Sequence, residues 1–244
     1  MIIQGIIFDI NGTLIDIRTD EGCEEIYRAI SHFLTYQGIY IDRREVREAY
    51  YRIMDEQRKA SPEEHPEFDA VAVWREFVRR HSGSFALPSD KLEHPRFLAE
   101  MYRGISLQRL RLYPDVKDLL DDLGSRFRLA AVSDGQSVWA LPELRAVGID
   151  SYFDPVIISS DFGFRKPDRR LFEAALSGQG LAPENVLFVG NDLYRDIFGA
   201  RELGMKTVFF SSNQGRKEMD GVNPDYIIYR FAELSQAIDF FERQ

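Results

Sequence analysis

Four short segments of the chain carry carboxylate, hydroxyl, amide and ammonium groups that could form one reactive centre. Three of the four directly follow short apolar runs of the kind that form buried strands. In chain order, the segments are Asp9-Ile10-Asn11-Gly12-Thr13-Leu14, Ser133-Asp134-Gly135, Lys166-Pro167 and Gly190-Asn191-Asp192-Leu193-Tyr194-Arg195-Asp196. Open α/β sheets bind ligands beyond the carboxyl ends of their parallel strands, so we expect the four segments to meet at one edge of such a sheet.

Asp9 is the candidate nucleophile. It follows the apolar run from Ile2 to Phe8, which would place its carboxylate at the end of a buried strand. Gly12 lets the backbone approach a ligand closely, and together with Thr13 it is a candidate for phosphate binding. Taken alone, the segment could equally be an ordinary turn, since Asn-Gly is a common turn dipeptide.

The second and third segments could hold a phosphoryl group. The hydroxyl of Ser133 and the backbone N–H groups of Asp134 and Gly135 would each meet one phosphate oxygen. Lys166 would supply a compact positive charge, which carboxylates and a phosphate need if they share a small site. Arg165 is the rival cation, and a solvated surface lysine is the ordinary alternative.

The fourth segment contains oxygen ligands for a metal ion. Magnesium prefers hard oxygen ligands and usually takes a few carboxylates together with waters and a phosphate oxygen. Asp192 and Asp196 are four residues apart, so a helical turn could direct both carboxylates toward Asp9. Asn191 is a further candidate ligand. Asp192 is also suited to cap the following helix, as an additional role.

The spacing of apolar residues predicts a doubly wound, mainly parallel α/β sheet. From Leu110 onward, short apolar runs alternate with amphipathic stretches, as in repeated βαβ units. Besides the amino-terminal strand, the predicted strands are Phe127 to Val132, Val156 to Ile158, Val186 to Val189, Thr207 to Phe210 and Asp225 to Ile228. The predicted helices lie near Val116 to Leu123, Val138 to Val147, Arg169 to Leu176, Tyr194 to Leu203 and Phe231 to Phe241. Pro167 suits a first helical position, which would place Lys166 in the loop just before a helix.

Residues 16–105 have helical periodicity and no strand pattern. Their apolar stripes predict four helices, with Ser61-Pro62-Glu63-Glu64 as one of the start signals. We interpret this segment as a smaller, all-helical cap that is inserted into the core and closes over the motif residues. The predicted domains are therefore a core of residues 1–15 and 106–244 and a cap of residues 16–105.

Charge and cysteine content favour a cytoplasmic protein that acts on small metabolites. With 31 basic and 40 acidic residues, the net charge is −9, which argues against nucleic acid and anionic membranes as partners. No apolar run approaches membrane-spanning length, and the start of the chain lacks the basic flank of a signal peptide. Cys23 is the only cysteine, which excludes an intrachain disulfide. Monomer and homodimer are both compatible with the sequence.

The four segments, in this order and after these elements, resemble the four motifs of the haloacid dehalogenase superfamily across essentially the whole chain. The insertion between the first and second motifs is similar to the helical cap of that family. The resemblance implies a Rossmann-like core and a hydrolase in which Asp9 attacks a phosphoryl group or a carbon. For a phosphatase it also implies magnesium, bound by Asp9, by the backbone carbonyl of Asn11 and by acids of the fourth motif.

Three positions depart from the family pattern. Asn11 stands where the phosphatases carry a second aspartate that acts as general acid and then as base. An amide cannot exchange a proton at neutral pH, and general acid–base catalysis contributes about 10²–10⁴-fold, so we expect a slower reaction. Asn191 likewise replaces an aspartate, and Asp134 stands where asparagine is frequent. We therefore hypothesise that Asp192 supplies the metal ligand that Asn191 cannot, with Asp196 assisting.

Three functions fit these residues. The first is a magnesium-dependent phosphatase of small metabolites that forms an aspartyl-phosphate on Asp9, with water, a substrate group or a cap residue as the substitute proton carrier. The second is a 2-haloacid dehalogenase-type hydrolase, which needs no magnesium and also lacks the second aspartate. The third is a poorly catalytic phosphate-binding or regulatory protein. We rank the phosphatase first. Gln136 and Trp139, near the second motif, are candidates for substrate contact.

Overall fold

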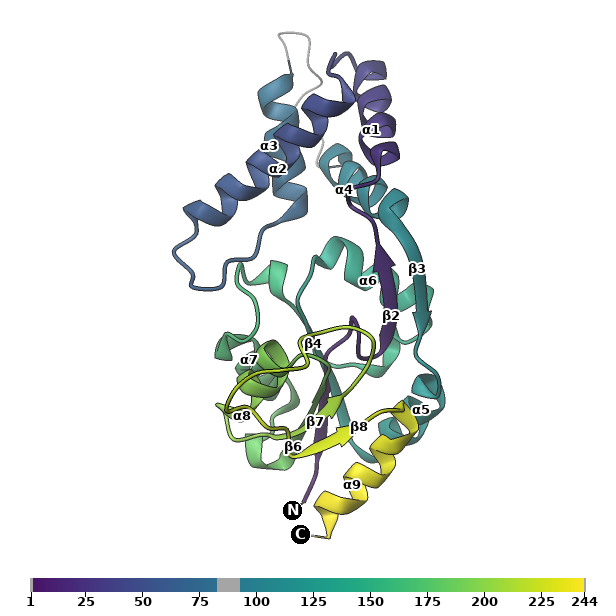
Figure 1. Ribbon diagram of the computed structural model, residues 1–244, viewed down its shortest axis with the longest axis vertical. Coiled ribbons are helices and arrows are strands. Elements are labelled where there is room, and N and C mark those ends of the chain that lie inside the picture. Colours follow the sequence, from purple (N-terminus) through teal and green to yellow (C-terminus); the bar gives the residue numbers. More distant parts are fainter. Residues whose placement is uncertain (1, 83–92, 244) are drawn as a thin grey trace.

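A six-stranded sheet lies at the centre of the computed structural model, which describes residues 2–82 and 93–243 (Figure 1). Its strands are β1 Gly5–Phe8, β4 Arg128–Ser133, β5 Val156–Ile158, β6 Val186–Gly190, β7 Lys206–Phe210 and β8 Tyr226–Ile228. They lie in the order β5-β4-β1-β6-β7-β8, and all neighbouring strands are parallel. The winding direction reverses beside β1, so the carboxyl end of β1 lies at a topological switch point, where such sheets bind ligands.

Alternate side chains of β1 pack on opposite faces of the sheet. Ile6 and Phe8 belong to one hydrophobic cluster and Ile7 to another. The first cluster also contains apolar residues of α5 Val116–Arg126, α6 Ser137–Ala146 and α9 Leu234–Glu242. The second contains apolar residues of α7 Arg169–Gln179 and α8 Gly199–Arg201. Helices therefore cover both faces of the sheet, which confirms the predicted doubly wound, mainly parallel α/β core.

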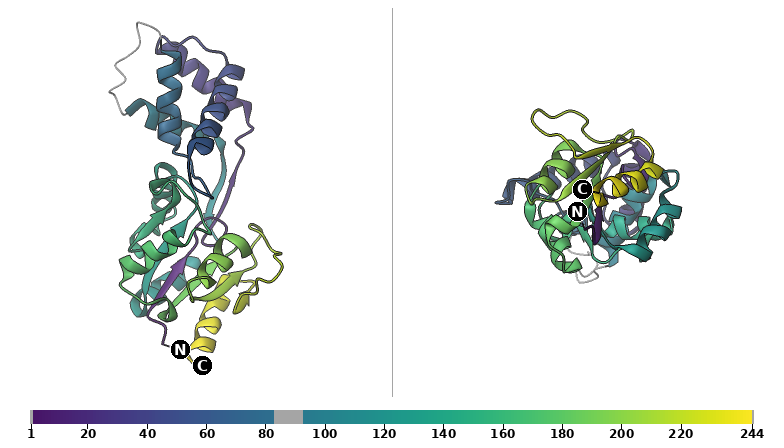
Figure 2. Two further views of the ribbon diagram at one scale, coloured as in Figure 1. Left: turned by 90° about the vertical axis from the view of Figure 1, so that its left-hand side faces the viewer. Right: turned by 90° about the horizontal axis from the view of Figure 1, so that it is seen from below.

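The cap helices form a separate hydrophobic cluster above the carboxyl edge of the sheet (Figure 2). They are α1 Glu24–Tyr36, α2 Arg43–Ala60, α3 Ala70–His81 and α4 Glu93–Ser106. The ring of Tyr50 lies at the centre of this cluster, 4.8 Å from the ring of Trp74 and 4.7 Å from that of Tyr102. In the described part of the chain, no helix is both long and apolar enough to span a bilayer.

A two-stranded antiparallel ribbon joins the cap helices to the sheet (Figure 1). Its strands are β2 Ile15–Thr19 and β3 Leu107–Leu112. The prediction that residues 16–105 contain no strand is therefore wrong for β2. Ile15 and Ile17 do alternate with Asp16 as in a half-buried strand, but a five-residue alternation is a weak signal when its partner strand follows four helices.

The predicted helix start at Ser61 is wrong, and Pro167 does not take the predicted first helical position, although α7 begins at Arg169 as predicted. Helix α2 ends at Ala60 with Ser61 as its C-cap, and α3 begins at Ala70 behind its N-cap, Asp69. Pro167 is not the first residue of α7, because Asp168 is the N-cap of that helix. In both places an aspartate side chain accepts a backbone N–H of the first turn, and this interaction fixes the start of the helix.

Candidate active site

The four motif segments meet at the carboxyl edge of the sheet. Asp9 directly follows β1, Ser133 ends β4 and Gly190 ends β6. Because β4, β1 and β6 are neighbours, their carboxyl ends lie side by side. Lys166 reaches the same place from the loop before α7. The structure thus brings together one residue from each of the four segments.

Lys166 joins two buried carboxylates. Its Nζ lies 2.6 Å from Oδ1 of Asp9 and 2.6 Å from Oδ1 of Asp196, and it also donates to the carbonyl of Val132 at 3.0 Å. Burial disfavours the charged form of this lysine, but Asp196 and Asp9 more than compensate and raise the pKa of Lys166 above its ordinary value. The ammonium therefore stays charged and holds the two carboxylates close together.

Asp9 is held in place by its neighbours on two sides. Its backbone N–H donates to the carbonyl of Val189 in β6 at 2.9 Å, and Thr13 Oγ1 donates to Asp9 Oδ2 at 2.9 Å. The turn between Asp9 and Thr13 requires Gly12, whose φ is 87° and where an added Cβ would lie only 2.2 Å from Nδ2 of Asn191. The carboxylate of Asp9, the hydroxyl of Thr13 and the amide of Asn191 are thereby fixed relative to one another.

Asn11 carries a buried oxygen without a partner. Its Oδ1 is buried and accepts no hydrogen bond from the described residues. Buried polar atoms are normally paired, because an unpaired one keeps its full desolvation cost. A water, an ion or a substrate group that approached this oxygen would remove that cost. Asn11 itself, as an amide, has no acidic proton to give such a group.

The predicted phosphate cradle is partly occupied by protein groups. The backbone N–H of Gly135 donates to Oγ of Ser159 at 2.8 Å. Asp134 Oδ1 accepts the backbone N–H of Lys166 at 2.9 Å, whereas its buried Oδ2 has no hydrogen-bond partner among the described residues. Ser133 is almost fully buried, and its Oγ makes a long contact of 3.4 Å with the carbonyl of Asp134. The hydroxyl of Ser133 is therefore the cradle group best able to turn toward a ligand.

A π-helical turn, Leu193–Phe198, forms part of the fourth motif. Asp192 is its N-cap and Asp196 lies within it, so the two acids have different hydrogen-bond partners. This turn and the short α8 replace the single helix predicted from Tyr194 to Leu203. Asp196 Oδ2 accepts the backbone N–H groups of Asn191 and Asp192, both at 3.0 Å, while its Oδ1 contacts Lys166. Of the two acids, Asp196 is the one that shares the Lys166 contact with Asp9.

The carboxylate of Asp192 is committed to other donors. Its Oδ1 accepts the backbone N–H groups of Tyr194 and Arg195, in agreement with the predicted N-cap role. Its Oδ2 accepts hydrogen bonds from the guanidinium of Arg195 and from the backbone N–H of Arg216. Burial opposes ionisation of Asp192, but these donors outweigh burial and lower its pKa. For Asp196 the balance is reversed, because burial and the nearby Asp9 raise its pKa although Lys166 opposes the shift.

The ion-paired side chains of the site carry more negative than positive charge. They are the carboxylates of Asp9, Glu67, Asp134, Asp192 and Asp196 and the cations Arg165, Lys166 and Arg195. Five carboxylates against three cations leave a surplus that a divalent cation would neutralise. The carboxylates of Asp9 and Asp196 and the backbone carbonyl of Asn11 are hard oxygen ligands of the kind that magnesium prefers, and the unpaired side-chain Oδ1 of Asn11 is a further oxygen of this kind. Within residues 2–82 and 93–243 no ready-made cluster of three metal-ligating side chains exists, and Lys166 lies between the two carboxylates instead.

Sequence reasoning missed Glu67, which lies in the cap segment between α2 and α3. Ser159 Oγ donates to its Oε2 at 2.8 Å, and this is the same hydroxyl that accepts the N–H of Gly135. Arg165, the rival cation, does not reach Asp9; its Nε lies 3.5 Å from Glu67 and 3.7 Å from Asp134. One glutamate in a loop among many surface acids gives no sequence signal for this position.

The two residues considered for substrate contact connect the core to the cap instead. Gln136 Oε1 accepts the backbone N–H of Ala70 at 2.7 Å, and its Nε2 donates to the carbonyl of Phe68 at 2.7 Å. Trp139 Nε1 donates to the carbonyl of Ala99 at 2.8 Å. Both side chains are therefore used to dock the cap helices onto α6.

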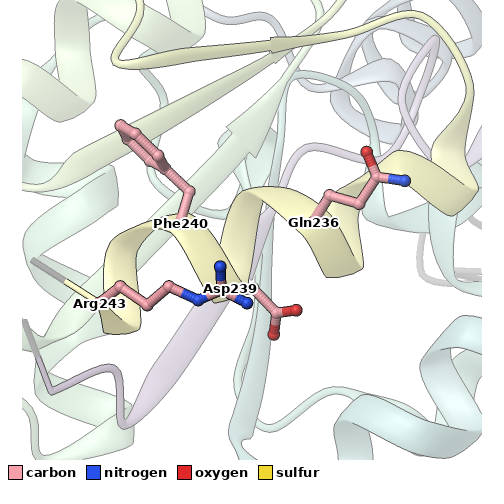
Figure 3. Close-up of a pocket in the computed structure, with 4 residues that line it drawn as sticks. All are labelled: Gln236, Asp239, Phe240 and Arg243. Atoms are coloured by element: carbon pink, nitrogen blue, oxygen red, sulfur yellow. The ribbon is translucent and has the colours of Figure 1, made fainter.

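A surface depression of about 410 Å³ lies elsewhere, on α9 (Figure 3). It is lined by Gln236, Asp239, Phe240 and Arg243. Helix α9 packs on one face of the sheet, at the end of the molecule far from the cap, and carries none of the motif residues (Figure 1). This depression is not part of the candidate active site.

The fold and the site define an α/β enzyme with a carboxylate–lysine–carboxylate centre at the switch point of its sheet. A family model described as haloacid dehalogenase-like hydrolase matches residues 3–204. The chain belongs to this family, so the resemblance noted in the sequence is confirmed and the protein is a hydrolase.

Several relatives carry the name glyceraldehyde 3-phosphate phosphatase. That of Methanopyrus kandleri is 31% identical over 242 residues, which cover 97% of each chain. That of Methanothermobacter thermautotrophicus is 36% identical over 122 residues, which are 50% of this chain and 54% of that protein. Among solved structures, a 2-haloacid dehalogenase from Pseudomonas syringae superposes with a TM-score of 0.70 at 20% identity, covering 98% of this chain and 100% of that one. At this identity the structural likeness shows the fold alone.

Proposed function

We propose that the protein is a magnesium-dependent phosphatase of a small phosphorylated metabolite and forms an aspartyl-phosphate on Asp9. The observation that carries the proposal is the pair of carboxylates, Asp9 and Asp196, that contact one Lys166 ammonium at 2.6 Å each. A carboxylate held next to a cation at the carboxyl end of a central strand is suited to attack a phosphoryl group, because the cation offsets the repulsion between two anions.

The chain's own residues divide the work of the first step. A carboxylate oxygen of Asp9 forms the new bond to phosphorus while the bond to the leaving oxygen breaks. Lys166 and the hydroxyl of Ser133 stabilise the charge on the phosphoryl oxygens. Water then hydrolyses the aspartyl-phosphate and restores Asp9. Asn11 takes part in neither proton transfer, so the leaving oxygen and the attacking water exchange protons with water, with a substrate group or with a residue of the cap.

We assign the magnesium site to the carboxylates of Asp9 and Asp196 and to the backbone carbonyl of Asn11, with the amide of Asn191 as a further candidate. Magnesium would neutralise charge on the transferred phosphoryl group. Both oxygens of Asp192 and both oxygens of Asp196 already accept hydrogen bonds, so hydrogen bonding does not separate the two acids. We assign Asp196 as the ligand because it shares the Lys166 ammonium with Asp9, and we describe Asp192 as a support because its partners are Tyr194, Arg195 and Arg216. This assignment revises the hypothesis that Asp192 replaces the missing acid at position 191.

The names of the relatives support a small phosphorylated substrate. The net charge of −9 favours such a metabolite over a nucleic acid. The single, unpaired Cys23 fits a reducing compartment, and we propose that the protein acts in the cytoplasm.

The deciding experiment measures phosphate release from a panel of small phosphomonoesters that includes glyceraldehyde 3-phosphate. The parent protein should release phosphate with magnesium and not with a chelator. Asp9→Asn should lower kcat at least about 10³-fold, because it removes the nucleophile. Asp239→Asn, an exposed aspartate on α9 (Figure 3), is the matched control and should behave like the parent. Acid quenching of a single turnover should trap one phosphoryl group on the peptide that contains Asp9.

Asn11 is the one observation that favours a second function, a carbon–halogen hydrolase. Such an enzyme needs no second aspartate and no magnesium. Release of chloride from 2-chloropropionate in the presence of a chelator, without phosphate release from any ester, would replace the phosphatase proposal. Absence of both activities and of a trapped phosphoryl group would instead indicate a phosphate-binding or regulatory protein.

A further inference from the structure

The loop after β7, residues 211–217, contacts the fourth motif at several points. Asn191 Nδ2 donates to Oγ of Ser212 at 3.3 Å. The backbone N–H of Arg216 donates to Oδ2 of Asp192 at 3.0 Å. The loop therefore bonds to the side chains of both Asn191 and Asp192. A displacement of the loop would move Asn191 and Asp192 with it.

The same loop also lies against the first motif. The Cβ of Gln214 would be only 3.1 Å from a Cβ added at Gly12, and a Cβ added at Gly215 would be 2.2 Å from the carbonyl oxygen of Asn191. Contacts this close leave no room for a side chain at either glycine. The loop is thus packed directly onto the turn that carries Asn11 and onto the backbone of the fourth motif.

The side chain of Gln214 reaches from this loop to the ribbon that joins the core to the cap. Its Nε2 donates to the carbonyl of Ile17 in β2 at 3.1 Å. The same nitrogen lies 3.5 Å from Oδ1 of Asp16 and 3.5 Å from Oη of Tyr113. Gln214 therefore bonds to the middle of β2 and lies close to Tyr113, the residue that directly follows β3.

The part of the ribbon that Gln214 contacts carries two ion pairs between its strands. Asp16 is buried and lies 3.3 Å from Nε of Arg109 and 3.0 Å from Nη2 of Arg111, both on β3. Beyond this pair, the register of the ribbon shifts between Arg18 and Thr19. A two-stranded ribbon is marginally stable alone, so contacts from the core determine how it is oriented.

We infer that Gln214 is a positioning residue that couples the orientation of the cap to the fourth motif. It bonds through its amide to the ribbon formed by β2 and β3, and its loop bonds to Asn191 and Asp192. When the cap swings on the ribbon, the loop transmits the movement to the motif, and displacement of the motif in turn tilts the ribbon. The catalytic consequence rests on the proposed function, whereas the coupling itself does not.

The test measures the distance between cap and core by pulsed electron spin resonance. Nitroxide labels are placed at Tyr40→Cys, an exposed position between α1 and α2, and at Asp239→Cys on α9, in a Cys23→Ser background. The distance distribution of this protein is compared with those of Gln214→Met and Gln214→Ala. Gln236→Ala, an exposed glutamine on α9, is the matched control (Figure 3).

Methionine keeps the length of the side chain and its packing on the Gly12 turn but removes the N–H donor, whereas alanine removes both. If the bond to Ile17 positions the ribbon, both variants give a broader and longer distance distribution than the parent, and the control does not. A normal distribution for Gln214→Met with an altered one for Gln214→Ala would mean that Gln214 only fills space, which overturns the inference. Unaltered distributions in both variants overturn it as well.

Kinetics provide a second readout. Loss of one hydrogen bond should lower kcat/KM about fivefold in both Gln214 variants, mainly through a higher KM. The distance measurement needs neither substrate nor magnesium, so a failed phosphatase assay with altered distributions rejects the proposed function and keeps the coupling. Altered kinetics with unaltered distributions reject the coupling and keep the proposed function.

Discussion

Asn11 is the residue that most limits the proposed reaction. The surrounding turn retains the other groups: Asp9 has a hydrogen bond from Thr13 and an ion pair with Lys166, and Asp196 lies opposite. The Oδ1 of Asn11 is buried and has no hydrogen-bond partner among the described residues. In the proposed reaction, the function that Asn11 lacks is proton transfer.

Asn11→Asp should raise kcat for phosphate release by about 10²-fold or more, because a carboxyl group can protonate the leaving oxygen and then activate water. Asn11→Ala should show no gain. The measurement is steady-state phosphate release with magnesium. Peptide mass analysis of the parent is the control, since Asn-Gly is prone to deamidation and would form the aspartate spontaneously. Equal kcat for Asn11→Asp and the parent would show that another group already carries the proton.

Lys166 should contribute to stability as well as to chemistry. Lys166→Met leaves the buried carboxylates of Asp9 and Asp196 facing each other without a cation, and breaking such a buried pair costs about 3–5 kcal/mol. Lys206→Met, which removes the more exposed ion pair with Asp225, should cost less than about 1 kcal/mol. Urea unfolding in a chelator measures both free energies. Equal losses in the two variants would contradict this account of the site.

At the scale of elements, the carboxyl end of β6 leaves no space for a side chain. A Cβ added at Gly190 would lie 2.5 Å from the Cβ of Asp196, so the strand and the following π-helical turn meet only because this residue is glycine. Gly190→Ala should therefore lower the free energy of unfolding by about 1–3 kcal/mol and weaken activity. Gly104 in α4 is exposed and has no atom within 4 Å of an added Cβ.

Gly104→Ala is accordingly the matched control with the opposite expected sign. Alanine at an unhindered, exposed helical position should stabilise the protein by about 0.5–1 kcal/mol. Thermal unfolding of the two glycine variants and the parent measures the difference. If both variants shift stability in the same direction, the close approach at Gly190 does not restrict that position.

The strands could be predicted from the sequence because each is a buried apolar run that one local pattern describes. Asp9, Ser133 and Asp196 followed from those strands, since parallel strands deliver the residues after them to one edge, whereas Lys166 was predicted from its place in the loop before a helix. Both strands of the ribbon, β2 and β3, were missed because each is stabilised by a partner far along the chain. Glu67 and Gln214 were missed for the same reason: their roles depend on contacts between distant loops, and their own neighbourhoods in the sequence are ordinary polar stretches.

At the scale of the whole molecule, a loop of the cap docks beside the catalytic edge of the core. The backbone N–H of Glu67 donates to the carbonyl of Gly163 at 3.0 Å, and that of Arg165 donates to the carbonyl of His65 at 2.8 Å. These bonds hold the cap next to Lys166, whose neighbour Arg165 also pairs with the Glu67 side chain. The cap and the core have separate hydrophobic clusters, so such contacts decide how firmly the cap is closed.

Docking of the cap should depend on pH through Glu67. Burial and the nearby Asp134 raise the pKa of Glu67 above its ordinary value of 4.5, although Arg165 and Ser159 oppose the shift. The folded protein therefore binds this proton more tightly than the unfolded chain does. The stabilising effect is fully present below the unfolded pKa and is lost as the pH rises through the raised pKa of the folded state.

Glu67→Gln imitates the protonated carboxyl group at every pH. Relative to the parent, this variant should gain unfolding free energy as the pH rises from about 5 to about 8, since only the parent must then bury an ionised carboxylate. Urea unfolding across this range measures the difference, in which all other titrating groups cancel. Glu64→Gln, at a neighbouring carboxylate that is 89% exposed, should show no such trend. The stability of Glu67→Gln relative to the parent could instead stay constant with pH, or fall. That result would mean that the ion pair with Arg165 outweighs burial and that the folded protein holds Glu67 as an anion.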